Sequence, residues 1–241
     1  MSDAYVVPTP PPGPRGPDPT YSIPAALAFG RAQTWANIWQ ILLGGVLIGG
    51  TEIAGQIAQQ ICNDRIQNSI DRGDGTPGGL LLLEIAIGVA LAIFGTVYSV
   101  GIVRASLEAI DGEPVRVSKL LHWKSVWPVF LSSLLTILGF AVGLIMLIIP
   151  GLVFLFLAYY AQYFIIDRGE GPWTAIISSI RMVREHLGTF FLFFLACVGV
   201  IVLGMVALLI GLVVAIPVVY FATAYTYRAF APARPQDTAW V

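Results

Sequence analysis

Two acidic residues lie inside otherwise apolar stretches of the chain, Glu52 and Glu84. A carboxylate at membrane depth is costly to bury, and in transporters such groups often carry protons or cations. Both acids also lie near the predicted ends of their stretches, where a side chain can reach water instead. Two interpretations therefore stay open, an ion or proton site and a pair of solvated carboxylates.

A second group combines tyrosines and arginines at the ends of alternate apolar stretches. Its members are Tyr98, Tyr159, Tyr163, Arg104 and Arg228. Guanidinium groups bind phosphate in a bidentate manner, and buried tyrosines need hydrogen-bond partners. The group predicts a polar pocket for a lipid headgroup or another ligand. The alternative is an aromatic belt with hydrogen bonds between helices.

The sequence contains no convincing match to a known catalytic motif. Gly73, Gly75 and Gly78 satisfy GxGxxG, but the pattern lies in a polar loop with Pro77 inside it rather than between a strand and a helix. The two histidines have no neighbouring ligand set. The sequence therefore predicts no cofactor, no metal site and no enzymatic activity.

Composition places these residues in a membrane. Of 241 residues, 57% are hydrophobic and 11% are charged, against about 25% charged in a typical soluble domain. No Asp, Glu, Lys or Arg occurs between residues 125 and 166. As one helix that run would be about 63 Å long, twice the ~30 Å hydrocarbon core. We expect it to reverse at Pro150 and Gly151.

The same reasoning predicts an all-α integral membrane bundle with six transmembrane helices. The expected spans are residues 35–54, 80–103, 125–149, 151–166, 188–210 and 213–227, with residues 211–217 forming the last turn. Residues 22–230 form the membrane domain. Residues 1–21 and 231–241 are predicted to be flexible tails, and the first is rich in proline.

Positive charge indicates the orientation. With six spans, eleven of the thirteen lysines and arginines fall on the side that holds both termini. This distribution predicts a bacterial inner-membrane protein with cytoplasmic termini. It gives no reason to expect a nucleic-acid partner.

Amphipathic segments precede the expected hairpins. Trp173, Ile176, Ile177, Ile180, Val183 and Leu187 share one helical face, and Ala25, Ala28, Ala32, Trp35 and Trp39 share another. Both segments, with a weaker one near residue 118, predict cytoplasmic helices in the interface plane. They suggest a threefold repeat of interfacial helix, span, turn and span, although generic membrane composition also produces such a pattern.

Partners are predicted at three places. Membrane lipids surround the spans, and the proline-rich tail could bind a protein module. Small residues four apart, such as Gly45 with Gly49 and Gly139 with Gly143, allow close helix packing. That packing would lie within the chain or between copies in a homo-oligomer.

The stretch 148–191, IIPGLVFLFLAYYAQYFIIDRGEGPWTAIISSIRMVREHLGTFF, resembles a known family. It is similar to the six-span membrane domain attached to some glycerophosphoryl diester phosphodiesterases, and to stand-alone bacterial relatives of that domain. The resemblance extends over residues 22–230. It implies a fold and no chemistry, because this chain has no counterpart of the phosphodiesterase catalytic domain.

Two functions follow from these patterns. The first is a non-enzymatic membrane protein that binds or organises lipid or a membrane protein partner. The alternative is a small-solute or ion transporter or channel that uses Glu52 and Glu84 as coupling acids.

Overall fold

The computed structural model describes residues 21–72, 78–112, 123–146, 148–206 and 210–231. All regular elements in these ranges are α-helices. They are α1 (Ile23–Ala36), α2 (Ile38–Asp71), α3 (Gly78–Ile110), α4 (Trp123–Met146), α5 (Ile148–Ala158), α6 (Ala161–Arg168), α7 (Pro172–Glu185), α8 (Leu187–Val206) and α9 (Ile210–Phe230). The all-α prediction is confirmed. Both predicted tails, apart from Tyr21 and Ala231, lie outside the described residues, as does most of the glycine-rich loop.

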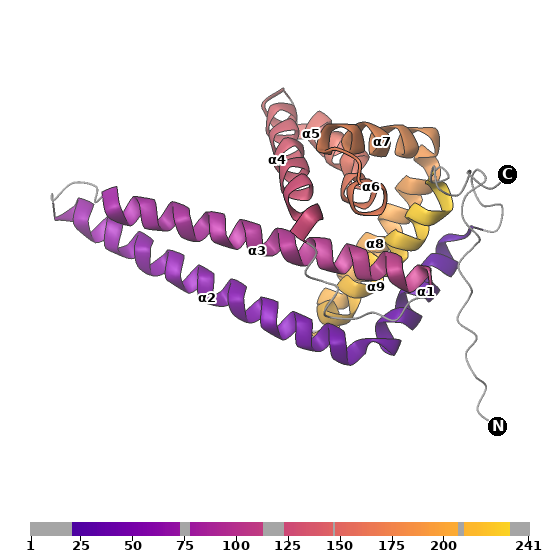
Figure 1. The fold of residues 1–241 in the computed structure, drawn as a ribbon, viewed down its shortest axis with the longest axis horizontal. Coiled ribbons are helices and arrows are strands. Elements are labelled where there is room, and N and C mark those ends of the chain that lie inside the picture. The colour runs from indigo at the N-terminus through magenta and orange to yellow at the C-terminus, as the bar shows by residue number, and fades with distance from the viewer. Residues whose placement is uncertain (1–20, 73–77, 113–122, 147, 207–209, 232–241) are drawn as a thin grey trace.

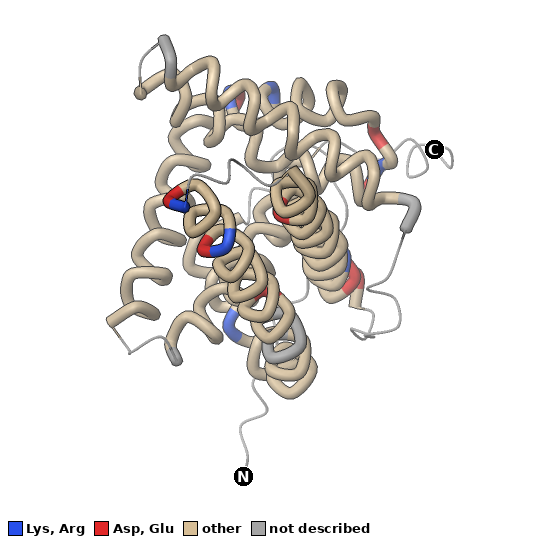
Figure 2. Tube along the Cα trace, turned by 90° about the vertical axis from the view of Figure 1, so that its left-hand side faces the viewer, with Lys and Arg blue, Asp and Glu red and all other residues tan. Residues whose placement is uncertain are grey.

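Six segments are long and apolar enough to cross a membrane, as the sequence predicts. They are Ile38–Asp71, Gly78–Ile110, Ser125–Leu144, Ile148–Arg168, Leu187–Val206 and Gly211–Phe230. Charged residues are sparse along all of them (Figure 2). The chain is therefore a multi-pass membrane protein by length and composition.

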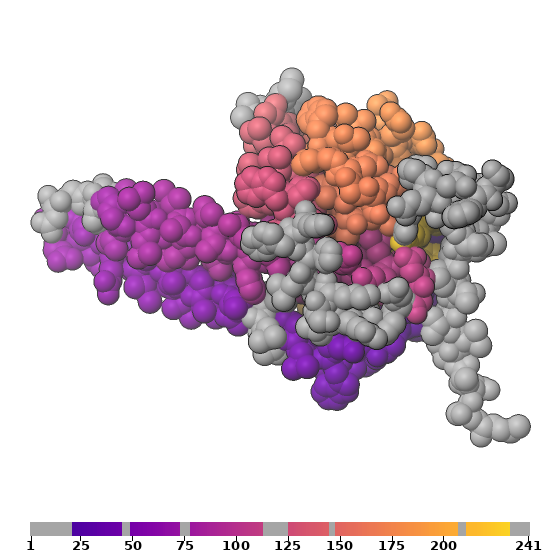
Figure 3. Space-filling model, in the orientation of Figure 1, coloured from indigo at the N-terminus to yellow at the C-terminus, as the bar shows by residue number. Residues whose placement is uncertain are grey.

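The spans pair as three helical hairpins, α2 with α3, α4 with α5, and α8 with α9. The α2–α3 hairpin projects away from the other helices along most of its length (Figures 1 and 3). Its outer surface carries large exposed apolar side chains such as Ile53, Ile57 and Leu82, as a lipid-facing hairpin would. Buried residues concentrate instead near the C-terminal ends of α3, α6 and α9.

The reversal in the uncharged run falls earlier than predicted. Pro150 and Gly151 lie in the first turn of α5, which begins at Ile148, whereas α4 ends at Met146. A proline is tolerated in a first helical turn because the amide hydrogen that it lacks has no partner there. Gly151 packs against Gly143 of α4. A Cβ added to Gly143 would lie 2.6 Å from the Gly151 Cα. These glycines therefore allow α4 and α5 to pack closely, and Gly151 is not part of the turn between them.

The fourth span is broken at Tyr159 and Tyr160, between α5 and α6. Ser179 of α7 supports the break, since its hydroxyl donates to the Leu157 carbonyl (2.6 Å) and accepts from the Tyr160 N–H (3.1 Å). One side chain thus satisfies two backbone groups that a continuous helix would pair. The sixth span differs from expectation in the opposite way, because residues 211–217 are helical and belong to α9.

Helices α1 and α7 precede the first and third hairpins and resemble each other. Each has 14 residues with a proline in its first two positions. Each ends at a single non-helical residue, Asn37 or His186, before the next span begins. This likeness supports a repeated unit. The segment 113–122, where part of the middle copy is expected, lies outside the described residues.

The buried faces of these two helices differ from the predicted stripes. α1 buries Phe29, Gly30 and Thr34 and leaves Trp35 60% exposed. α7 buries Ala175 and Met182 with Ile176 and Val183, while Trp173 and Ile177 stay exposed. An apolar stripe alone does not distinguish a protein-facing side from a lipid-facing one.

Helix α1 runs antiparallel along α9. At one end the Tyr21 hydroxyl is hydrogen-bonded to the Thr226 hydroxyl (3.0 Å). Burial raises the pKa of Tyr21 to about 12, so the phenol is neutral near pH 7. Further along, a Cβ on Gly30 would collide with the Val218 carbonyl oxygen and lie 3.2 Å from the Ala222 nitrogen. The glycine therefore permits close contact between the two helices.

Candidate functional site

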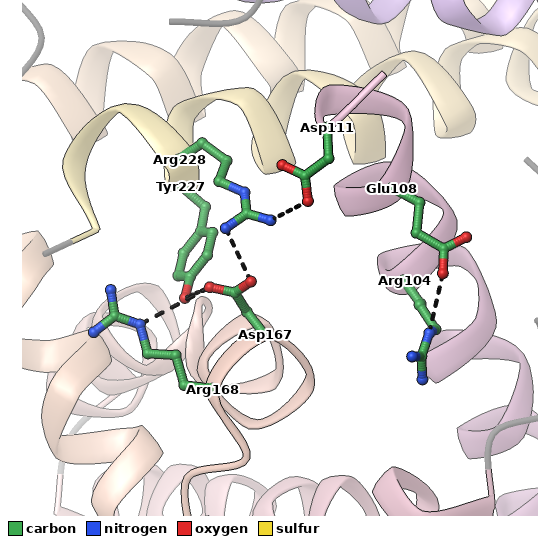
Figure 4. Close-up of polar contacts among 7 residues, drawn as sticks. All are labelled: Arg104, Glu108, Asp111, Asp167, Arg168, Tyr227 and Arg228. Atoms are coloured by element: carbon green, nitrogen blue, oxygen red, sulfur yellow. Dashed lines mark hydrogen bonds and ion pairs between the residues drawn. The ribbon is translucent and has the colours of Figure 1, made fainter. Parts of the chain in front are cut away.

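The ends of α3, α6 and α9 meet in a charged cluster, which we call the junction and define by Asp111, Asp167, Arg168, Tyr227 and Arg228 (Figure 4). Arg228 bridges two carboxylates. Its Nη2 lies 2.7 Å from Asp111 Oδ2, and its Nη1 lies 2.9 Å from Asp167 Oδ1. One guanidinium thus connects three helices from separate hairpins.

Asp167 is the inner carboxylate of the junction, with a side chain only 4% exposed. It accepts a hydrogen bond from the Tyr227 hydroxyl (3.0 Å), and Arg168 Nε lies 3.9 Å away. The Arg168 guanidinium also lies over the Phe164 ring, 5.1 Å from its centroid. Asp167 therefore receives contacts from Arg228, Arg168 and Tyr227 on the inner side of the junction.

Local sequence explains why these groups lie at helix ends. Gly169 adopts φ 67° and donates its N–H to the Ile165 carbonyl, which ends α6 directly after Arg168. Gly112, with φ 79°, follows the end of α3 and leaves Asp111 at the helix terminus. Arg168 and Arg228 fall in the last turns of α6 and α9, where positive charge complements the helix dipole.

Of the two arginines that the sequence predicts as ligand-binding, Arg228 belongs to the junction and Arg104 does not. Arg228 is engaged by Asp111 and Asp167, so carboxylates of the chain already balance the charge that a phosphate would need. Arg104 lies on α3 outside this contact and pairs with Glu108 one turn away (3.3 Å). The acidic partners were missed, because each lies far from Arg228 along the chain. The available signal was that Asp167, like Arg228, ends an even-numbered span.

The predicted tyrosines are only partly brought together. Tyr163 is fully buried, its hydroxyl donates to the Tyr220 carbonyl (3.5 Å), and its ring packs 5.5 Å from Tyr227. Tyr159 is 44% exposed and Tyr98 is half-buried. The even-numbered spans do meet here, since the Ser99 hydroxyl of α3 donates to the Gln162 side-chain oxygen of α6 (2.8 Å).

The two intramembrane acids lie at different levels of the α2–α3 hairpin. The Glu52 carboxylate of α2 lies against Gly95 of α3, where a Cβ would be 3.8 Å from Oε1. Gly95 lies eleven residues beyond Glu84 on the same helix, or about 16 Å. The structure therefore does not bring the two acids together. No cluster of three His, Cys, Asp or Glu side chains able to hold a metal occurs among the described residues.

An apolar groove that the sequence did not reveal lies between α1, α8 and α9. It has a volume of about 570 Å³, which is in the range of small-molecule and lipid sites. Leu27, Arg31 and Trp35 contribute one face of α1, while Val200 of α8 and Val214 of α9 lie opposite. At the α8–α9 contact, a Cβ on Gly204 would lie 2.8 Å from the Ala215 Cβ, so the two helices touch directly. Arg31 is the charged residue that lines this groove.

Comparison with known proteins finds relatives without an assigned role. Over 128 residues the chain is 30% identical to the Uncharacterized protein Rv2560 of Mycobacterium tuberculosis, and equally to the Uncharacterized protein Mb2590 of Mycobacterium bovis. The match covers 53% of this chain and 39% of each relative. No family model matches, and no solved structure matches. The resemblance to the phosphodiesterase-associated domain therefore stays a prediction.

Proposed function

We propose that this chain is a non-enzymatic, multi-pass membrane protein that binds membrane lipid. The groove between α1, α8 and α9 carries the proposal, because it is apolar, large enough for an acyl chain, and bounded on two sides by the spans Leu187–Val206 and Gly211–Phe230. An acyl chain in this groove would bury apolar surface of both partners against protein of matching shape. The junction fits a structural role rather than a binding role, since Arg228 is paired with carboxylates of the chain itself.

Filling the groove tests this function. Ala28 lines the groove, whereas Ala36 is an exposed residue of the same helix outside the lining. We expect Ala28→Trp to reduce the lipid that stays with the gently purified protein, measured by native mass spectrometry. Ala36→Trp, which adds the same bulk elsewhere, should retain the wild-type amount. Equal lipid retention in both variants would contradict the proposal.

Transport remains the alternative, but the geometry supports it less. Coupling acids act together when they share a site, and Glu52 lies about 16 Å along the hairpin from the level of Glu84. Homo-oligomerisation through small residues has mixed support. Gly139 and Gly143 pack on α5 within the chain, while Gly49 has no neighbouring atom within 4 Å of an added Cβ.

The proposed orientation puts both termini in the cytoplasm and the α2–α3 tip outside. Native Cys62 is a poor reporter of this arrangement because it is 6% exposed. Asn68, two turns closer to the tip, is exposed. We expect Asn68→Cys, in a chain whose native cysteines are replaced by serine, to react with an impermeant maleimide in intact cells. Labelling that requires lysis would reverse the orientation.

A further inference from the structure

Arg31 lies beside the first half of the span Gly211–Phe230, because it lines the same groove as Gly211, Val214 and Val218. The preceding residue, Gly30, contacts Val218 and Ala222, and these residues fall near the centre of the span Gly211–Phe230. Charge counting placed Arg31 with the other arginines of the cytoplasmic side. The antiparallel packing of α1 on α9 instead carries it into the apolar part of the bundle. A charge at such a position indicates a functional site unless it is neutralised.

Within the described part of the chain, Arg31 forms no hydrogen bond and no ion pair, and its side chain is exposed to the groove. The other arginines near the membrane domain's core differ in this respect. Arg104 pairs with Glu108, and Arg228 pairs with two carboxylates. A guanidinium stays protonated even in an apolar setting, so neutralisation of Arg31 requires an anion.

The surroundings of Arg31 indicate which anion fits. Leu27 lies one turn before it and Trp35 one turn after it on the groove-lining face of α1. Tryptophan favours the level of lipid headgroups, and the groove beyond Leu27 is apolar. This order, aromatic ring, cation and apolar channel, matches a phospholipid that has a negatively charged headgroup and an extended acyl chain. A phosphodiester can accept two hydrogen bonds from one guanidinium.

We propose that the groove selects an anionic phospholipid, with the lipid phosphate on Arg31 and one acyl chain along Leu27 and Val200. The proposal rests on the lipid-binding function proposed above and adds the class of lipid. The carrying observation is charge complementarity, since Arg31 is a cation without a partner among the described residues in an otherwise apolar groove.

A competition experiment tests the selectivity. The full-length protein is equilibrated in nanodiscs that contain equal amounts of phosphatidylglycerol and phosphatidylethanolamine, and the lipids that remain bound after gentle release are identified by native mass spectrometry. We expect the wild type to retain phosphatidylglycerol with a preference of roughly tenfold, typical of one charge-assisted contact. Arg31→Gln should lose that preference while it retains lipid, and Arg31→Lys should keep part of it.

Arg181→Gln is the matched control, because Arg181 is an exposed arginine on α7 that does not line the groove. It should bind lipids as the wild type does. Retention of both lipids in equal amounts by the wild type would overturn the selectivity and leave the groove as a lipid site. Absence of bound lipid in the wild type would overturn the lipid-binding function itself. A wild type that is dimeric and an Arg31→Gln variant that is monomeric with unchanged lipid content would assign Arg31 to an interface between copies and overturn the proposal.

Discussion

Replacing Asp167 with alanine is expected to lower the free energy of unfolding by about 3–5 kcal/mol. The substitution removes the inner carboxylate of the junction and leaves Arg228, which is 13% exposed, without that partner. It also removes the acceptor of the Tyr227 hydroxyl. Arg228 keeps Asp111, but that carboxylate is 49% exposed, so the inner side of the guanidinium retains its desolvation cost without a charge to offset it. Thermal unfolding in detergent, monitored by size-exclusion chromatography of heated samples, should show a midpoint lower by roughly 10 °C.

Asp111→Ala is the matched control, because Asp111 contacts the same guanidinium at a similar distance. Its side chain is 49% exposed, so water replaces the lost carboxylate at little cost. We expect a loss of about 0–1 kcal/mol, the usual range for solvent-exposed ion pairs. Comparable losses for the two alanine variants would show that burial does not set the strength of the junction.

The six spans were predictable because hydrocarbon thickness constrains helix length directly. The uncharged run between residues 125 and 166 is too long for one crossing, and the structure indeed divides it between α4 and the α5–α6 pair. The position of the reversal was less predictable. Hydropathy is uniform across the turn, and a Pro-Gly pair fits a first helical turn as well as a loop. The break at Tyr159 depends on Ser179, a residue of another helix, and has no local signal.

Packing partners were harder to predict than spans. For α1, the alanine and tryptophan stripe seemed the natural buried face, but the protein contact is made by Phe29, Gly30 and Thr34. In lipid, apolar side chains gain little by facing protein, so small residues mark the contact better than apolarity does. Arg228 was recognised as a candidate from its position at a span end. Its partner Asp167 depends on a contact between residues 61 positions apart in the sequence, which only the tertiary fold establishes.

Gly30→Leu is expected to separate α1 from α9 and to lower the free energy of unfolding by about 1–3 kcal/mol, the usual cost of overpacking. A side chain at this position meets the Val218 carbonyl and the Ala222 backbone nitrogen, which belong to a helix backbone and cannot rotate away. Gly49→Leu is the control, because nothing lies within 4 Å of a Cβ there. It should leave the thermal midpoint unchanged or raise it, since leucine favours a helix more than glycine does.

Gly30→Leu also separates two roles in lipid binding, the shape of the groove and its charge. Gly30 and Arg31 are neighbours in sequence, but the glycine holds α1 against α9 while the arginine faces the lipid. We therefore expect Gly30→Leu to lose bound lipids of both charge classes, whereas Arg31→Gln changes only their ratio. Because α1 supplies one wall of the groove, lipid cannot remain there once that helix has moved. A Gly30→Leu protein that kept wild-type stability and lipid content would show that α1 neither packs on α9 nor lines the lipid site.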